Sequence, residues 1–90
     1  MNQYIQSGNC EATELDGEWI ILNSTQFTIT KLNEVGGHCW SMLKEAQTVD
    51  TLTQTLLEKF SIRENLEQIK MDMEEFVENL VQYGLINYAD

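Results

Sequence analysis

The sequence predicts an α+β domain in which a three-stranded antiparallel sheet is followed by three helices. Polar and apolar side chains alternate from Thr25 to Thr30, which is typical of a half-buried strand. From residue 33 onwards, apolar residues recur about every 3.6 positions, which is typical of amphipathic helices. The 90-residue chain corresponds to one domain, which we place at residues 10–87, after a flexible N-terminus at residues 1–9.

Three strands are expected before the first helix. The Asp16-Gly17 pair favours a type I′ turn, because both central residues of this turn need a positive φ. The turn joins strands at about 10–15 and 18–22, and a second turn leads into a third strand at about 25–31. A sheet this small cannot close into a barrel, so at least one edge strand keeps unpaired main-chain groups.

Each of the three predicted helices has a capping residue near its start. Asn33 caps the first helix, Thr48 caps the second, and Ser61 opens a capping box before the third. Gly84 suits the left-handed position that ends the third helix. The pair Gly36-Gly37 is unfavourable in a helix and indicates the close approach of another backbone. The inward-facing apolar positions are Val35, Cys39, Trp40 and Leu43 in the first helix, Leu52, Leu56, Leu57 and Phe60 in the second, and Leu66, Ile69, Met73, Phe76, Val77 and Leu80 in the third.

The charge balance restricts the class of partner. Fifteen acidic and five basic residues give a net charge of −10. This charge opposes binding to nucleic acid or to an anionic membrane, because both depend on Lys and Arg. It favours a positively charged partner, or gives high solubility alone. No apolar run approaches the roughly 18 residues that span a bilayer, and the N-terminus lacks the pattern of a signal peptide. We therefore expect a cytoplasmic protein.

No group of residues predicts catalysis, a cofactor or a metal site. His38 is the only histidine, and no acidic residue stands at a triad-like spacing from it. Cys10 and Cys39 form neither a CxxC pair nor a metal-ligand spacing, so we expect free thiols in a reducing cytosol. The carboxylates of the third helix lie mostly on its solvent side. We expect a protein that is not an enzyme and carries no cofactor.

The third strand is the favoured binding element. It is rich in threonine, which suits exposure to water, and a peptide can pair with such an edge through main-chain hydrogen bonds. Phe27 and Ile29 point to one face of the strand, and the threonines between and after them point to the other. We expect a groove between this edge and the third helix, lined by Ile29, Met73 and Phe76, with Asp72 and Asn79 at its rim. An alternative is that Phe27 or Ile29 belongs to the core.

Four segments together resemble a known family. They are Asp16-Gly17, Lys31-Leu32-Asn33-Glu34, Cys39-Trp40-Ser41-Met42-Leu43, and Asp72-Met73-Glu74-Glu75-Phe76-Val77-Glu78-Asn79-Leu80 with the ending Gly84-Leu85-Ile86. In this order and spacing they resemble the PqqD-like family, whose members are the RiPP recognition elements. The run from Asn33 to Gly37 before Trp40 is most similar to the stand-alone versions of lasso peptide pathways.

The resemblance implies a winged helix-turn-helix fold and a function without catalysis. Such domains capture the leader of a ribosomally synthesised precursor peptide as an added antiparallel strand, in the cleft between the third strand and the third helix. They present it to a leader protease and a lasso cyclase. Leaders of this type carry a Tyr-x-x-Pro motif, often with lysines upstream, which suits an acidic receptor. The peptide-binding residues implied for this chain are Gln26, Phe27, Thr28, Ile29, Thr30, Lys31, Asp72, Met73, Phe76 and Asn79.

Several alternatives stay open at this point. The other flank of the third helix, with Lys70, Glu74 and Val77, could line the groove instead. The chain could serve as peptide chaperone in another pathway, PQQ-like or built around a radical enzyme, or as a structural subunit that forms a homodimer through its edge strand. A winged-helix DNA-binding protein is disfavoured, because residues 64–79 carry six acidic residues and one lysine.

Overall fold

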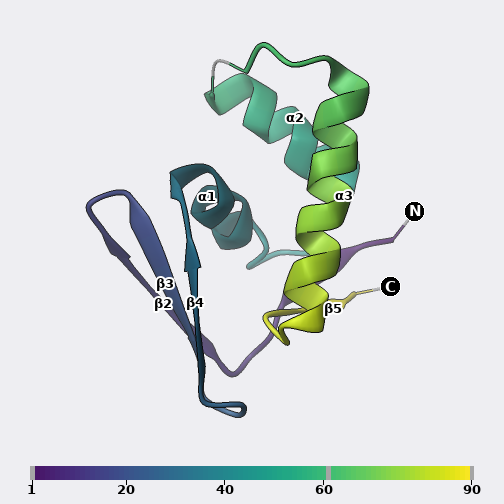
Figure 1. Ribbon diagram of the computed structural model, residues 1–90. Coiled ribbons are helices and arrows are strands. Elements are labelled where there is room, and N and C mark those ends of the chain that lie inside the picture. The colour runs from purple at the N-terminus through teal and green to yellow at the C-terminus, as the bar shows by residue number, and fades with distance from the viewer. Residues whose placement is uncertain (1, 61, 90) are drawn as a thin grey trace.

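The computed structural model describes residues 2–60 and 62–89, and it contains the predicted sheet and helices. The sheet consists of β2 (Cys10–Leu15), β3 (Glu18–Asn23) and β4 (Thr28–Leu32), antiparallel and in the order β2-β3-β4 (Figure 1). The helices are α1 (Glu34–Met42), α2 (Val49–Lys59) and α3 (Leu66–Gln82). The α+β class and a three-stranded antiparallel sheet followed by three helices are confirmed. None of the helices in the described ranges is long and apolar enough to cross a membrane.

A second, two-stranded sheet corrects the expected flexible N-terminus at residues 1–9. Here β1 (Tyr4–Gln6) pairs antiparallel with β5 (Ile86–Tyr88), so the two chain ends lie side by side (Figure 1). The side chain of Tyr4 is buried, and its ring centroid lies 5.3 Å from that of Tyr88. The domain therefore includes residues before Cys10, because the N-terminal strand covers part of the core.

One face of the β2-β3-β4 sheet packs against the helices. Ile21 and Asn23 of β3 are buried there, while α1 lies over β3 and β4. Gly37 of α1 provides room for the indole of Trp19, which a Cβ at this position would overlap. The close approach expected at Gly36-Gly37 is therefore made by a side chain of the sheet rather than by its backbone. The fully buried core includes Ile21, Leu43, Leu52, Val77, Leu80, Leu85 and Ile86.

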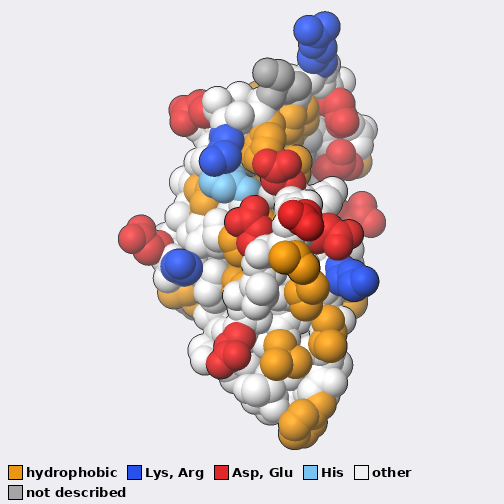
Figure 2. Space-filling model, turned by 90° about the vertical axis from the view of Figure 1, so that its left-hand side faces the viewer, with side chains coloured by type: hydrophobic (Ala, Val, Ile, Leu, Met, Phe, Trp, Pro, Cys, Tyr) orange, Lys and Arg blue, Asp and Glu red, His pale blue; other side chains and the backbone are white. Residues whose placement is uncertain are grey.

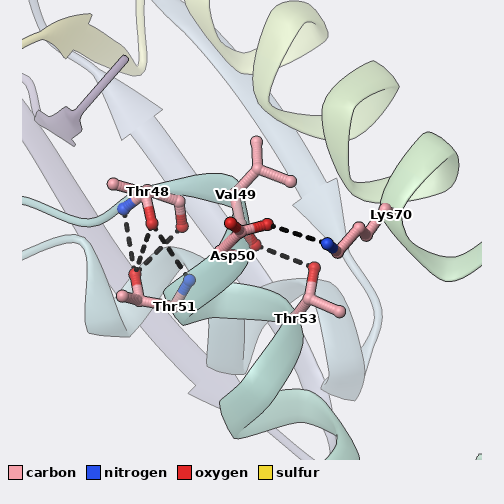
Figure 3. Close-up of polar contacts among 6 residues, drawn as sticks. All are labelled: Thr48, Val49, Asp50, Thr51, Thr53 and Lys70. Atoms are coloured by element: carbon pink, nitrogen blue, oxygen red, sulfur yellow. Dashed lines mark hydrogen bonds and ion pairs between the residues drawn. The ribbon is translucent and has the colours of Figure 1, made fainter. Parts of the chain in front are cut away.

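Local capping fixes the ends of the helices. The side chain of Asn33 accepts a hydrogen bond from the Gly36 N–H at 2.7 Å, as predicted. Thr48 forms the predicted cap of α2, reciprocally with Thr51 (Figure 3). In contrast, α3 begins later than expected, because Asn65 caps it by accepting from the Gln68 N–H. The expected capping residue Ser61 lies outside the described residues.

The ends of α3 determine its place against the other elements. An ion pair of 3.3 Å joins Lys70 of α3 to Asp50 in the first turn of α2 (Figure 3). At the other end, Gly84 has a φ of 76° and terminates the helix as predicted. The Gly84 carbonyl accepts a hydrogen bond from the Asn23 side chain at 3.2 Å. This bond ties the end of α3 to the end of β3.

Candidate functional site

The strand β4 is an edge of the sheet, and the register shows which of its main-chain groups are free. Asp16 and Gly17 have φ values of 53° and 82°, so the β2-β3 turn is of the predicted type, and its flanking residues Leu15 and Glu18 form a hydrogen-bonded pair. Such pairs alternate along an antiparallel ladder. The Ser24 N–H donates a hydrogen bond to the Asn9 carbonyl. Ser24 follows Glu18 by six residues, so this bond fits the same alternation.

This alternation carries over to β4. Since the even-numbered residues of β3 bond to β2, Trp19, Ile21 and Asn23 turn their main-chain groups toward β4. Their partners in the β3-β4 register are Leu32, Thr30 and Thr28. The N–H and C=O groups of Ile29 and Lys31 therefore point away from β3. Within the described residues, β4 pairs with β3 alone, so these groups form a free edge.

A cavity of about 620 Å³ lies at the end of this free edge. It opens between the end of β4, the start of α1, the helix α2 and residues 69–76 of α3. Its lining is mostly apolar, and its charged residues are exposed. The lining residues are Lys31, Leu32, Asn33, Val35, Gly36, Cys39, Leu56, Ile62, Glu64, Ile69, Asp72, Met73 and Phe76.

Short-range packing positions the α3 wall of the cavity. A Cβ on Gly36 would lie 3.3 Å from Cε1 of Phe76, so the glycine lets the phenyl ring approach α1 closely. Met73 is buried beneath, while Phe76 is half-buried. The Gln68 side-chain amide donates to Oδ1 of Asp72 at 2.9 Å and orients that carboxylate. The wall thus combines an aromatic surface with an oriented acceptor.

The structure brings four of the predicted site residues to this cavity: Lys31, Asp72, Met73 and Phe76. Thr28 and Thr30 lie in β4 with their side chains on the helix-facing side of the sheet, since they pair with the buried residues of β3.

Three predicted positions and one predicted side-chain orientation differ from the structure. Gln26 and Phe27 precede β4, in a turn where the Asn23 side chain accepts from the Gln26 N–H at 3.1 Å. Phe27 has a φ of 56°, which is incompatible with an extended strand, and is 88% exposed. Ile29 pairs with exposed Leu22 on the opposite face of the sheet, so it neither lines the cavity nor joins the core. Asn79 is half-buried and lies outside the cavity lining.

The geometry separates the two flanks of α3. Val77 is fully buried, and Lys70 pairs with Asp50, so the alternative flank does not face β4. That flank borders a second pocket of about 510 Å³, lined by Asn2, Tyr4, Val49, Asp50, Met71, Glu74, Glu75 and Glu78. The cavity beside the free edge therefore belongs to the flank with Asp72 and Phe76.

Sequence reasoning assigned part of the cavity to the core. Val35, Cys39, Leu56 and Ile69 were expected to face inward, and they do so at the cavity wall or floor. The sequence feature that could have located the cavity is Gly36, because a glycine within a short helix indicates that another side chain packs closely against it.

Two titratable groups near this region have shifted pKa values. Burial raises the pKa of the Cys39 thiol to about 11. Burial, and then the charge of Lys59, lower the pKa of His38, whose ring meets Phe60 edge-on at 5.8 Å. Among the described residues, no three His, Cys, Asp or Glu side chains come together as a metal site. The cavity offers apolar walls and main-chain partners rather than a nucleophile–base pair.

Comparisons with known proteins give one matching family model and two solved structures with a similar fold. The sequence profile of the family described as Coenzyme PQQ synthesis protein D (PqqD) matches residues 18–86. The structure of TbiB1 in complex with the TbiA(beta) leader peptide has a TM-score of 0.81 at 23% identity, over 96% of this chain and 99% of that chain. The structure of a lasso peptide synthetase B1 complexed with the leader peptide has a TM-score of 0.78 at 13% identity, over 93% of this chain and 96% of that chain. At these identities the likeness shows a shared fold. Among curated proteins, none matches the sequence.

Proposed function

The chain belongs to the PqqD family, and from this premise we propose that it binds the leader region of a ribosomally synthesised precursor peptide without catalysing a reaction. The leader pairs with β4 as an added antiparallel strand beside α3, in a winged helix-turn-helix arrangement. The observation that carries this proposal is the free main-chain edge of Ile29 and Lys31, next to an apolar cavity. An edge alone gives affinity without selectivity, and the adjoining cavity supplies selection of side chains.

The direction of β4 orients the bound leader. The strand runs from Thr28 to Leu32, and the cavity lies at its Leu32 end. An antiparallel leader therefore enters with its N-terminal part at the cavity and leaves past Thr28 (Figure 1). We place Gln26 and Phe27 where the leader leaves the strand, and Asp72, Met73 and Phe76 where its anchoring side chain enters.

An aromatic leader residue fits the size and lining of the cavity. A tyrosine of a Tyr-x-x-Pro motif buries about 150–250 Å² of surface, which corresponds to roughly 4–6 kcal/mol at about 25 cal/mol per Å². Ordering of the leader offsets part of this free energy. Lysines upstream of the motif complement the net charge of −10.

The remaining parts of the proposal follow from the same premise. The chain presents the bound leader to a leader protease and a cyclase during lasso peptide maturation. It acts in the cytoplasm, since Cys10 and Cys39 are both free, as suits a reducing compartment. The binding unit is residues 10–87 together with Tyr4–Gln6, whose strand pairs with β5.

A titration with a synthetic leader tests the function. A fluorescein-labelled leader containing Tyr-x-x-Pro should bind with a micromolar or tighter Kd, measured by fluorescence anisotropy. The matched leader with Tyr replaced by Ala should bind at least about tenfold more weakly, because it leaves the cavity empty. Double-stranded DNA should not bind, since residues 64–79 are strongly acidic. DNA binding without leader binding would reject the proposal in favour of a nucleic-acid function.

A further inference from the structure

The turn between β3 and β4 presents an aromatic side chain to solvent. Phe27 is 88% exposed, more than any other large hydrophobic residue in the described ranges. Its φ of 56° lies in the left-handed region, which a bulky residue rarely adopts. The turn is the lowest part of the molecule in Figure 1, and Figure 2, which keeps the vertical direction, shows hydrophobic side chains down to this end. In the isolated chain, neither burial nor a favourable backbone conformation accounts for an aromatic residue here.

Polar contacts of its neighbours hold the turn in place. Asn23 is buried, and its side-chain oxygen accepts hydrogen bonds from the N–H groups of Thr25 and Gln26, at 3.0 and 3.1 Å. Its amide nitrogen donates to the Gly84 carbonyl at 3.2 Å, which ties the turn to the end of α3. The surrounding structure thus supports the strained conformation of Phe27. A residue that its surroundings keep in a disfavoured conformation indicates a functional constraint.

Strand pairing along β4 ends at Thr28. Phe27 is not extended, so the ladder cannot continue through it. A Cβ on Gly84 would lie 2.8 Å from Nε2 of Gln26, so the Gln26 side chain lies against the end of α3. The turn and α3 are therefore in contact at this end, whereas the cavity separates β4 from α3 at the Leu32 end. A leader that pairs with β4 has to turn away from the sheet beside Phe27.

The Phe27 ring is within reach of a leader that follows this path. A strand added to β4 lies about 4.8 Å from it, and successive Cα atoms are about 3.8 Å apart. The first leader residue beyond the paired segment is then a diagonal neighbour of Phe27, at about 7–8 Å, a distance that an aromatic side chain spans. This leader residue has lost its main-chain partners, so only a side-chain contact can hold it.

We propose that Phe27 is a second contact for the leader, outside the groove, and that its ring packs on an apolar side chain of the residue that directly follows the paired segment. The inference rests on the proposed function and adds to it a specificity-determining residue and the chemical class of a leader position. The cavity selects a side chain at the Leu32 end, and Phe27 selects one past Thr28. Main-chain bonds repeat every two residues and do not fix the register alone. With two contacts, the spacing between two leader side chains becomes part of recognition.

The test substitutes Phe27→Asn, because asparagine accepts the left-handed conformation and removes the ring. Phe27→Tyr keeps the ring, and Met71→Gln is the control on the flank of α3 away from the groove, where Met71 is 63% exposed. Two labelled synthetic leaders serve as probes. The long leader has leucine at the fifth position after its anchoring tyrosine and continues beyond it. The short leader is amidated and ends four residues after the tyrosine, so its strand matches the five residues of β4.

Stability and affinity should change in opposite directions. Urea unfolding of Phe27→Asn should give a free energy of unfolding equal to or above that of wild type, since backbone strain is relieved. Its affinity for the long leader should fall about tenfold, and its affinity for the short leader should stay within about twofold. Phe27→Tyr and Met71→Gln should bind both leaders like wild type.

The remaining outcomes overturn the contact. A lower stability of Phe27→Asn, with unchanged affinity in its folded fraction, would make Phe27 a structural residue. Equal affinities of Phe27→Asn and wild type for the long leader would remove Phe27 from the binding site and leave leader binding intact. An equal loss for both leaders would place the ring inside the paired segment. If wild type binds neither leader, the proposed function itself fails.

Discussion

The two edge strands of the sheet, β2 and β4, both present free main-chain groups, yet their side chains and surroundings differ. Five of the six residues of β2 are exposed, and two of them, Glu11 and Glu14, are acidic. In β4 the only charged residue is Lys31, and the strand ends at a cavity that α3 completes. Acidic residues on an edge oppose pairing with further acidic strands.

This difference shows what peptide capture requires beyond an unpaired edge. Main-chain hydrogen bonds contribute only about 0.5–1.5 kcal/mol each, because water competes for the same groups. The cavity beside β4 adds apolar burial, which β2 cannot offer. We therefore expect strand addition to be selective for β4, where an edge and a cavity meet.

Proline substitutions should have the largest effect and distinguish the two edges directly. Lys31→Pro should weaken leader binding at least about 100-fold, since proline removes a free donor and its ring blocks the incoming strand. Ala12→Pro is the matched change on β2, where the N–H also points away from β3, and should leave the Kd within about twofold. Anisotropy titrations of the labelled leader measure both values.

A third proline variant tests the assignment of the free edge. Thr30 pairs with Ile21, so Thr30→Pro should break the sheet and lower the free energy of unfolding by about 3 kcal/mol or more. Urea unfolding measures this loss. Equal losses of leader affinity in Lys31→Pro and Ala12→Pro would contradict the distinction between the edges.

Truncation of the cavity wall should have the next largest effect. Phe76→Ala should raise the Kd of the leader about tenfold, because it removes an apolar wall from the anchoring cavity. Met71→Ala, on the flank away from the groove, is the control and should leave affinity unchanged. If Phe76→Ala instead costs about 3 kcal/mol of stability with unchanged affinity in the folded fraction, Phe76 is core.

The two cysteines report on the two regions separately. Burial raises the pKa of both thiols, and that of the more deeply buried Cys39 at the cavity rises to about 11, so Cys39 has the smaller thiolate fraction at pH 8. Maleimide should label Cys10 of β2 first. Saturating leader should slow labelling of Cys39 further and leave Cys10 unchanged, as peptide mapping by mass spectrometry can measure. Protection of Cys10 alone would indicate that the leader binds along β2 and would contradict binding along β4.

Neutralising β2 should have the smallest effect. Glu11→Thr/Glu14→Thr removes two like charges from this edge and keeps strand preference, so self-association should tighten by about 0.5–1 kcal/mol. Sedimentation equilibrium measures the dimer constant, and leader affinity serves as the control. If saturating leader dissolves the new dimer, the two copies pair through β4, and the acidic residues do not protect β2.

Local rules explain which parts of the fold were predictable. Asp16-Gly17, Asn33 and Thr48 each act within four residues, so the turn and both caps follow from the sequence. The β1-β5 pair was missed because three polar-flanked residues at Tyr4–Gln6 find their partner at the other end of the chain. No local pattern encodes such a pairing.

The candidate site was predicted in part, for a related reason. Asp72 and Phe76 stand at the border of the apolar stripe of α3, which indicates a surface that is neither core nor solvent. The orientation of Ile29 depends on where β4 begins, and Phe27 delays that start through its positive φ. Cys39 also shows what the sequence cannot distinguish, because an inward-facing helix position can line a cavity or belong to the closed core.

Amide hydrogen exchange at Ile29, Thr30 and Lys31, followed by NMR with and without saturating leader, addresses the binding edge itself. The amide of Thr30 should be protected in both states, because it bonds to β3. Those of Ile29 and Lys31 should exchange rapidly in the free chain and slow at least about tenfold in the complex. Rapid exchange of both in the saturated complex would contradict strand addition on β4.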